Sequence, residues 1–172
     1  GYHIKGLIMN FVHTYWKELM EVPEFFTSLQ TPILKAFPKS RGKPLVFYSQ
    51  IDYNNWLKDN DVEKYNIHYY KGLGSSTNEE VKECFKTFNN NLLEYLYEPE
   101  IEDESVSPKM NKTDEAIELA FSKNRSDDRK EWLRNYDKNI KPDIVNNKIK
   151  ISEFINKELI HFSNYDNIRS IP

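Results

Sequence analysis

The chain has 172 residues, of which 38% are hydrophobic, 14% aromatic and 30% charged, enough for one ordinary domain or for pieces of two. No apolar run approaches the ~20 residues of a membrane span, and a single cysteine, Cys84, cannot form an internal disulfide. These features exclude a membrane-spanning or disulfide-stapled protein and suit a reducing compartment. The net charge of −3 argues against nucleic-acid binding by bulk charge but leaves a local basic patch possible.

The N-terminal segment is predicted to be an amphipathic helix. Gly1 to Lys5 show neither an initiator methionine nor a signal-peptide pattern, so we expect the chain to belong to a longer protein. Apolar residues recur at three- and four-residue spacing, at Ile4, Leu7, Ile8, Phe11, Tyr15 and Leu19. Pro23 ends this pattern. We expect these apolar side chains to form the buried face of the helix.

Two runs of aromatic and β-branched residues predict strands. The segment 45–48 follows the turn 40–44 and is typical of a buried strand, and 66–70 predicts a second strand. Between them, 52–58 predicts a short helix that carries Trp56. Strands that alternate with helices indicate an α/β fold with a mainly parallel sheet.

The second strand runs into the glycine-containing loop Lys71-Gly72-Leu73-Gly74-Ser75-Ser76. Ser76 and Glu79 have the spacing of a capping box, so a helix is predicted to begin there. Its expected buried face consists of Val81, Cys84, Phe85 and Phe88. Backbone N–H groups at such a helix start can bind an anion that glycine allows to approach closely. The alternative is an ordinary strand-to-helix turn in which glycine supplies a positive φ, and two glycines do not separate these interpretations.

The composition changes near residue 98, where the acidic run 98–104 predicts a solvated loop. Beyond it the chain is predicted to be helical over 114–123, over 127–136 with Ser126 as N-cap, and from the N-cap Ser152 to Phe162. The polar stretch 138–147 is expected to lack regular structure.

Basic residues on the second of these helices are candidates for phosphate binding. Arg125 and Arg129 share a helix face and can be presented together to a phosphate backbone, with Lys130 beside them. The alternative is a solvated face whose Asp127 and Asp128 favour the helix start through the helix dipole.

The sequence indicates neither a metal site nor a nucleophilic triad. The four histidines, His3, His13, His68 and His161, share no metal-ligand spacing, and Cys84 has no CxxC partner. His13 is expected to be a packed or partly exposed side chain.

Several segments, taken in order, resemble type IIA DNA topoisomerases. They are Gly1–Leu7, Phe47–Tyr48, Tyr69–Ser76, Ala120–Lys123, Asp128–Leu133, Phe154–Ile160, Phe162–Asn164, Asp166–Asn167 and Arg169–Pro172. The similarity covers essentially the whole chain and is weakest at 20–44, 98–112 and 136–150. Because the glycine-loop segment and the segment from Phe154 lie on one polypeptide, the sequence is most similar to the eukaryotic and some viral single-chain enzymes.

This resemblance implies a partial Toprim domain, Rossmann-like with a mainly parallel sheet, followed by a helical linker that leads into a winged-helix domain. Residues 1–97 correspond to the C-terminal part of the Toprim domain and 98–150 to an acidic loop and helical linker. Residues 151–172 correspond to the beginning of the winged-helix DNA-cleavage domain.

The resemblance also implies the activity of the parent protein, a nuclear homodimer that passes one DNA duplex through a transient double-strand break in another. That activity uses ATP, Mg²⁺ and a nucleophilic tyrosine. In the family the acidic metal triad precedes the position of Gly1 and the tyrosine follows that of Pro172. We therefore assign no catalytic or metal-binding residue, and expect this segment alone to be inactive and to bind neither Mg²⁺ nor ATP.

By position in the family, this segment supports the metal site and contacts the cleaved double-stranded DNA. Arg129 and Lys130 are expected to contact DNA, Lys71, Gly72 and Gly74 to lie near it, and His3 and Lys5 to border the metal site.

Two other classes stay open at this point. One is a helix-rich protein-interaction module with a chance glycine loop, and the other is a Toprim nuclease or primase, which the segment from Phe154 disfavours. The family's aspartate-bearing strand precedes Gly1, so apolar surface on the first helix is expected to be exposed and to promote self-association through Leu7, Phe11 and Tyr15.

Overall fold

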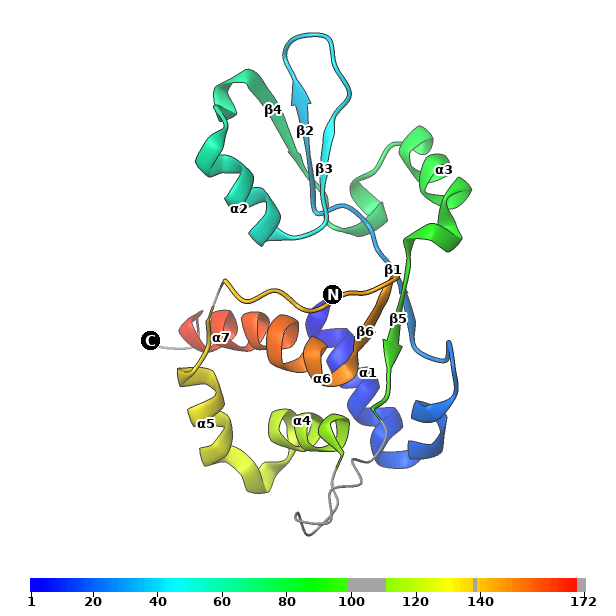
Figure 1. Ribbon diagram of the computed structural model, residues 1–172, viewed down its shortest axis with the longest axis vertical. Helices are drawn as coiled ribbons and strands as arrows, with labels where there is room; N and C mark the ends of the chain where they lie inside the picture. Colours follow the sequence, from blue (N-terminus) through cyan, green and yellow to red (C-terminus); the bar gives the residue numbers. More distant parts are fainter. Residues whose placement is uncertain (99–110, 138, 170–172) are drawn as a thin grey trace. The chain divides into compact units, whose positions relative to one another are not determined.

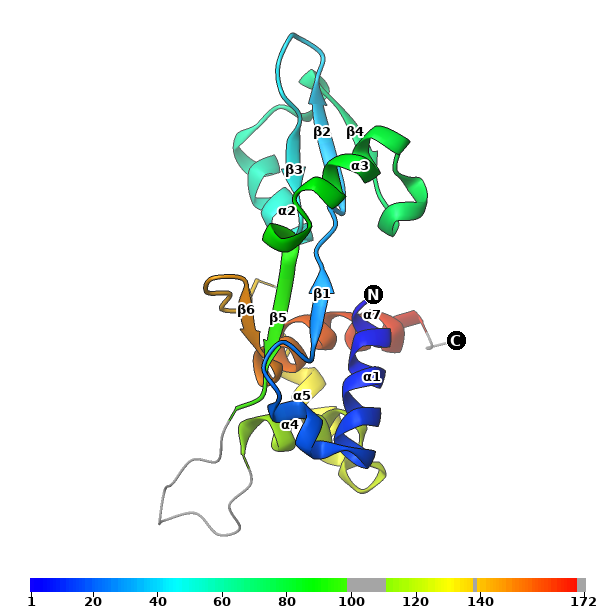
Figure 2. The same cartoon turned by 90° about the vertical axis from the view of Figure 1, so that its right-hand side faces the viewer.

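The computed structural model describes residues 1–98, 111–137 and 139–169, which fall into two compact units (Figures 1 and 2). Unit 1 comprises Gly1–Thr27 and Glu94–Pro172, and unit 2 comprises Ser28–Leu93. The chain enters unit 2 along β1 (Thr27–Leu29) and leaves it along β5 (Leu92–Leu96). These bounds differ from those of the three segments expected from the sequence. The predicted acidic loop lies, after Glu98, outside the described residues.

Unit 2 contains a three-stranded sheet with the order β3–β2–β4 (Figure 1). The central strand β2 (Leu34–Pro38) pairs antiparallel with both β3 (Leu45–Phe47) and β4 (Tyr65–Tyr69). The expectation of a mainly parallel sheet is therefore wrong for this unit. The physical reason is that the short connection between β2 and β3 reverses the chain, whereas a parallel pair requires a long crossover.

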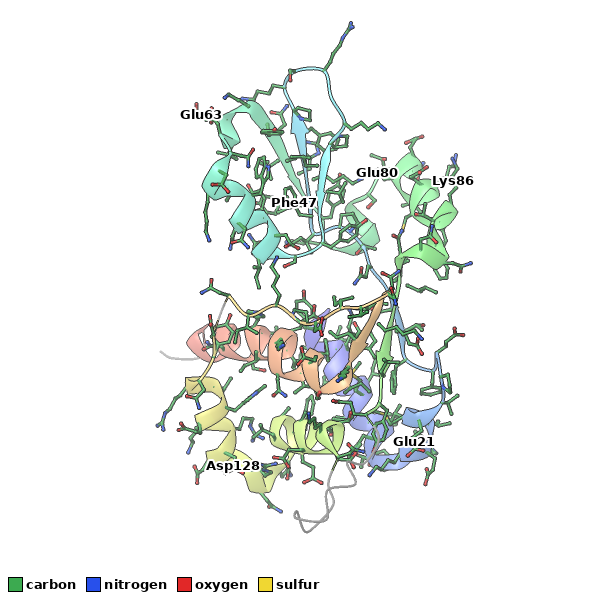
Figure 3. All side chains as sticks on the ribbon, in the orientation of Figure 1. Glu21, Phe47, Glu63, Glu80, Lys86 and Asp128 are labelled. Atoms are coloured by element: carbon green, nitrogen blue, oxygen red, sulfur yellow. The ribbon has the colours of Figure 1, made fainter. Side chains whose placement is uncertain are left out.

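The core of unit 2 lies between this sheet and α2 (Gln50–Asp59), where Figure 3 labels Phe47. Leu34, Ala36 and Phe47 pack against Tyr53, and Trp56 packs beside them. The predicted helix with Trp56 is confirmed, and the Ser49 hydroxyl caps it by accepting from the Ile51 amide at 3.1 Å. The prediction of a buried strand at 45–48 is only partly right, because β3 is an edge strand of the sheet.

After β4 a short 3₁₀-helix (Gly72–Ser75) leads into α3 (Asn78–Lys86). The capping residue is Thr77, one position later than predicted, and its partner is Glu80. Val81 and Cys84 are half-buried, but Phe85 and Phe88 are exposed and stack on each other with ring centroids 5.9 Å apart. The predicted buried face of this helix is thus only half right.

In unit 1, helix α1 (Tyr2–Tyr15) buries Gly6, Met9 and Val12. The face predicted to be buried is wrong, since all of its members are exposed: Ile4, Leu7, Ile8, Phe11, Tyr15 and Leu19, the last in the following 3₁₀-helix (Lys17–Glu21). The cause is a close approach at Gly6, where a Cβ atom would lie 3.0 Å from the Leu159 side chain and 3.1 Å from that of Phe121. The expectation of exposed apolar surface on this helix is confirmed.

The rest of unit 1 is mostly helical. The helices are α4 (Lys112–Phe121), a 3₁₀-helix (Lys123–Arg125), α5 (Ser126–Arg134), α6 (Ile151–Glu153), a π-helix (Phe154–Leu159) and α7 (Ile160–Arg169). The three predicted helical regions are confirmed, but two predicted caps are wrong. Helix α5 begins at Ser126 itself with Arg125 as the N-cap residue, and the last helical region begins after Lys150 and not after a Ser152 cap. None of the described helices is long and apolar enough to cross a membrane.

The core of unit 1 gathers where β6 (Lys148–Lys150) meets these helices. Strand β6 pairs parallel with β5, with Tyr95 opposite Ile149. Within the described part of 138–147, a tight turn at Asn146 and Asn147, which have φ angles of 51° and 58°, leads into β6. The largest fully buried apolar side chains of this core are Ile117, Ile149, Ile151, Phe154 and Ile155.

The orientation of α1 generates a stability prediction. Replacing buried Met9 with Ala should lower the free energy of unfolding by about 2–4 kcal/mol, because it leaves a cavity. The double change Leu7→Ser and Phe11→Ser removes only exposed side chains, so it should change the free energy of unfolding by about 0.5 kcal/mol or less per site. It should also reduce self-association, because it removes exposed apolar surface. Urea unfolding and light scattering measure both effects. A larger loss from the double serine variant than from Met9→Ala would show that the helix buries the other face.

Candidate functional site

The loop after β4 requires only one of its two glycines for its backbone conformation. Gly72 has a φ of +68°, a value that L side chains rarely adopt, and a Cβ atom there would meet nothing within 4 Å. Gly74 shows no positive φ, and a Cβ atom there would also lie in open space. Lys71 is exposed. The geometry therefore matches a strand-to-helix turn that presents a lysine.

The start of α3 is satisfied by its own side chains. The Thr77 hydroxyl accepts from the Glu80 amide at 3.3 Å, and the Glu80 carboxylate accepts from the Thr77 amide at 3.0 Å. Glu79 and Glu80 also place negative charge in the first turn, where it interacts favourably with the helix dipole. The Thr77 and Glu80 amides are therefore already bonded, and the negative charge in the first turn disfavours an anion at this helix start.

Glu80, labelled in Figure 3, also joins the sheet to α3 through a partly buried ion pair with Lys35. Its Oε1 accepts from the Lys35 ammonium at 2.6 Å and from the Tyr70 hydroxyl at 2.6 Å. The bond from Lys35, and then that from Tyr70, lowers the pKa of Glu80 to about 2. Burial, followed by the bond to Glu80, raises the pKa of Tyr70 to about 12. No motif indicates this network, because its members lie on three separate elements.

The same network lines a cavity of about 170 Å³ within unit 2. Val46 and Tyr48 contribute apolar surface, and Cys84 and Thr87 of the α3 side complete the wall. The cavity lies on the sheet face opposite the α2 core, because Lys35 and Val46 pair across β2 and β3 while their neighbours Leu34 and Phe47 point into that core.

Arg129 is held inside unit 1 as a cap for α4. Its Nη1 donates to the carbonyl oxygens of Leu119, Ala120 and Ser122 at 3.1, 3.3 and 3.0 Å. The last carbonyls of a helix lack intrahelical partners, so a guanidinium there satisfies them and favours the dipole. Arg129 thus links α4 to α5, a role that the sequence pattern did not reveal.

Arg125 and Arg129, which were expected to share a helix face, bind different partners in the structure. Arg125 bridges Glu115 at 2.6 Å and Asp128, labelled on α5 in Figure 3, at 2.7 Å. Lys130 pairs with Asp127 at 2.7 Å with both side chains exposed. Exposed pairs of this kind contribute little free energy, so Lys130 can exchange its partner readily.

The two residues expected to border a metal site are both held by aromatic rings. The His3 ring stacks on Phe162 with centroids 4.8 Å apart, and the Lys5 ammonium donates to the Tyr95 hydroxyl at 3.0 Å. Burial raises the pKa of nearby Glu158, against the opposing effect of Lys5.

Within 1–98, 111–137 and 139–169, no three His, Cys, Asp or Glu side chains are grouped to hold a metal ion.

A buried carboxylate, Asp114, anchors a second network that the sequence reasoning missed. It accepts from His13 Nε2 at 2.7 Å, from the Lys17 ammonium at 2.6 Å and from the Tyr97 hydroxyl at 2.8 Å. Burial acts to raise the pKa of Asp114, but the bonds from Lys17, His13 and Tyr97 outweigh it and hold that pKa below its usual value. The expectation that His13 is a packed side chain is confirmed.

Residues 29–167 match the family described as the C-terminal associated domain of TOPRIM, and the chain belongs to this family. The chain is 43% identical over 175 residues to DNA topoisomerase 2 of Arabidopsis thaliana. It is 37% identical over 213 residues to DNA topoisomerase 2 of Acanthamoeba polyphaga mimivirus. These alignments cover 100% of this chain but only 11% and 17% of those relatives.

A solved structure shows the same fold. The DNA-binding, cleavage and re-ligation domain of Plasmodium falciparum topoisomerase II matches with a TM-score of 0.79 and 33% identity, over 100% of this chain and 22% of that one. The resemblance to type II topoisomerases and the mixed α/β fold, a partial Toprim domain with a helical region, are confirmed. The chance glycine loop of the interaction-module hypothesis is thereby disfavoured.

The Glu80 network generates a pH prediction. Because its folded pKa lies near 2 and its ordinary value is 4.5, Glu80 contributes stability that is fully present above pH ~4.5 and is lost as the pH falls toward 2. Glu80→Gln should lower the free energy of unfolding by about 1–3 kcal/mol at pH 7, and the difference should vanish near pH 2. Urea titrations across this range, with exposed Glu79→Gln as control, measure it. A difference that stays constant with pH would contradict the ion pair.

The capping role of Arg129 generates a second prediction. Arg129→Ala should destabilise the chain by about 1–3 kcal/mol, since it leaves helix-end carbonyls without their charged donor. Lys130→Ala should cost about 0.5 kcal/mol or less, because its pair is exposed. Denaturant unfolding measures the free energy of unfolding of both variants. Because Arg129 and Lys130 are adjacent and carry the same charge, the difference between the two losses reports the capping bonds and not the removal of a charge. Equal, small losses would show that Arg129 is not a structural cap.

Proposed function

We propose that this chain is part of a type II DNA topoisomerase, an isomerase that passes one duplex through a transient double-strand break in another. The observation that carries the proposal is the similarity of the whole chain to relatives named DNA topoisomerase 2 and to a topoisomerase II DNA-binding, cleavage and re-ligation domain. In this proposal residues 1–97 form the back of the Toprim domain, 98–150 the linker and 151–172 the beginning of the winged-helix domain.

The proposed task of the segment is to contact and position the cleaved duplex. Lys130 supplies a phosphate contact from α5, because its exposed partner Asp127 is easily replaced. Arg129 contributes through a guanidinium that is partly committed to the α4 carbonyls, so it also fixes the helix from which Lys130 projects. Lys71 supplies a second contact, and Gly72 and Gly74 lie beside it with open space around their Cα atoms.

The remaining requirements of the reaction belong to other parts of the parent protein. ATP and Mg²⁺ serve that protein as a whole, with His3 and Lys5 beside the metal site but not ligating it. The proposal includes a homodimer that acts in the nucleus on double-stranded DNA.

Activity assays test this proposal at two levels. The intact enzyme that contains this chain should relax supercoiled plasmid with ATP and Mg²⁺, whereas the 172-residue chain alone should produce neither relaxed topoisomers nor protein-linked linear DNA. Gel electrophoresis of the plasmid measures both outcomes. An intact enzyme that leaves DNA topology unchanged would overturn the proposed function, and relaxation by the isolated chain would overturn its assignment as a supporting segment.

A further inference from the structure

The connection between β2 and β3 carries a cluster of cations, Lys39, Arg41 and Lys43, which we call the basic tip. These residues alternate with Ser40 and Gly42, and no Asp or Glu follows them before Asp52. All three side chains are exposed. Among the ion pairs of the described residues, none involves a side chain of the basic tip.

The basic tip is fixed by its own backbone. The Lys39 amide donates to the Lys64 carbonyl at 2.9 Å, which ties the start of the connection to the residue before β4. A Cβ atom at Gly42 would lie 3.0 Å from the Pro38 ring, so the connection folds back against the end of β2. Figures 1 and 2 show that it projects beyond the helices of unit 2. Its charges are therefore presented from a constrained turn.

Other cations that the sequence nominated are already engaged. Arg125 is shared between two carboxylates and Arg129 caps α4, while Lys130 retains an exposed partner. The basic tip contrasts with them because its charges have no such partner in the part of the chain that the structure describes. In a chain of net charge −3, such a concentration of unpaired positive charge marks a surface for an anionic partner.

We propose that the basic tip binds the phosphate backbone of duplex DNA. The inference rests on the proposed function, which supplies DNA as the partner. Arg41 can bind a phosphate bidentately, and Lys39 and Lys43 act as point charges on either side of it. A protein partner fits less well, because the centre of a protein interface needs buried aromatic or aliphatic anchors and residues 39–44 offer only Ser40, Gly42 and Pro44 between the charges.

The register of the sheet makes this contact independent of Lys71. Pro38, beside the basic tip, lies opposite Tyr65, whereas Leu34 lies opposite Tyr69, two residues before Lys71. The two basic points therefore lie beyond opposite ends of the paired segment of β2 and β4, which itself spans roughly 13 Å at about 3.3 Å per residue. Distant sites of this kind contribute about additively, so loss of both should roughly equal the sum of the separate losses.

Salt-dependent binding of a duplex by the intact enzyme tests the proposal. In the triple variant Lys39→Ala, Arg41→Ala and Lys43→Ala, the slope of log K against log salt should fall by about 2–3, because each lost phosphate contact removes roughly 0.9. The matched control Lys58→Ala, Lys82→Ala and Lys86→Ala removes the same charge from α2 and α3 and should change the slope by less than about 1. The charge-conserving variant Lys39→Arg, Arg41→Lys and Lys43→Arg should keep the wild-type slope.

Each other outcome overturns a defined part of the proposal. Equal slope changes in the triple variant and its control would reduce the effect to overall charge and overturn the basic tip as a site. An unchanged duplex slope, with loss of binding to polyglutamate, would assign the tip to an acidic protein and also overturn it. A wild-type enzyme that binds no duplex would overturn the proposed function itself, whereas DNA relaxation with an unaltered slope in the triple variant would overturn the tip alone.

Discussion

The absence of a side chain at Gly6 determines how unit 1 is assembled. Because a Cβ atom there would come within 3.0 Å of Leu159 and 3.1 Å of Phe121, α1 can approach its neighbours at this residue only with glycine. That approach fixes the rotation of the helix, so Met9 and Val12 turn inward one and two turns later. The same rotation brings His13 to Asp114, which becomes the polar anchor of the α1–α4 contact.

Two carboxylates act as connectors of elements that are distant in the sequence, one in each unit. Asp114 joins α1 and the following 3₁₀-helix to α4, and Glu80 joins β2 and the end of β4 to α3. Each carboxylate accepts from more than one donor, so Asp114 keeps Lys17 and Tyr97 if His13 is removed, and Glu80 keeps the Tyr70 hydroxyl if Lys35 is removed. These networks therefore fix the positions of the elements that they join, and the Glu80 network also contributes stability at neutral pH.

Helices and strands could be predicted from the sequence where residues close together in the chain determine them. The helix carrying Trp56 and the strand before Lys71 follow from periodicity and turn residues. The buried face of α1 could not be predicted from the sequence. Exposed apolar residues on this helix have the same spacing as core residues would have, and only the packing at Gly6 distinguishes the two faces. The role of Arg129 was also hidden, since the carbonyls that it caps precede it by up to ten residues. The antiparallel pairing of β2 was missed because β2 itself was not predicted as a strand.

In the proposed function a chain with a net charge of −3 contacts a polyanion, and the distribution of its charge is what permits this contact. A uniformly basic surface would bind any phosphate backbone without regard to orientation, whereas a few accessible cations set the position of the duplex. Acidic side chains neutralise the cations with structural tasks, as Glu80 does for Lys35 and Glu115 does for Arg125. The cations of the basic tip have no acidic partner of this kind in the described part of the chain. Their backbone is held by the hydrogen bond from Lys39 to Lys64 and by the close approach of Gly42 to Pro38. Under the proposed function, therefore, the position of its cations, rather than its total charge, is the property through which this chain would contact DNA.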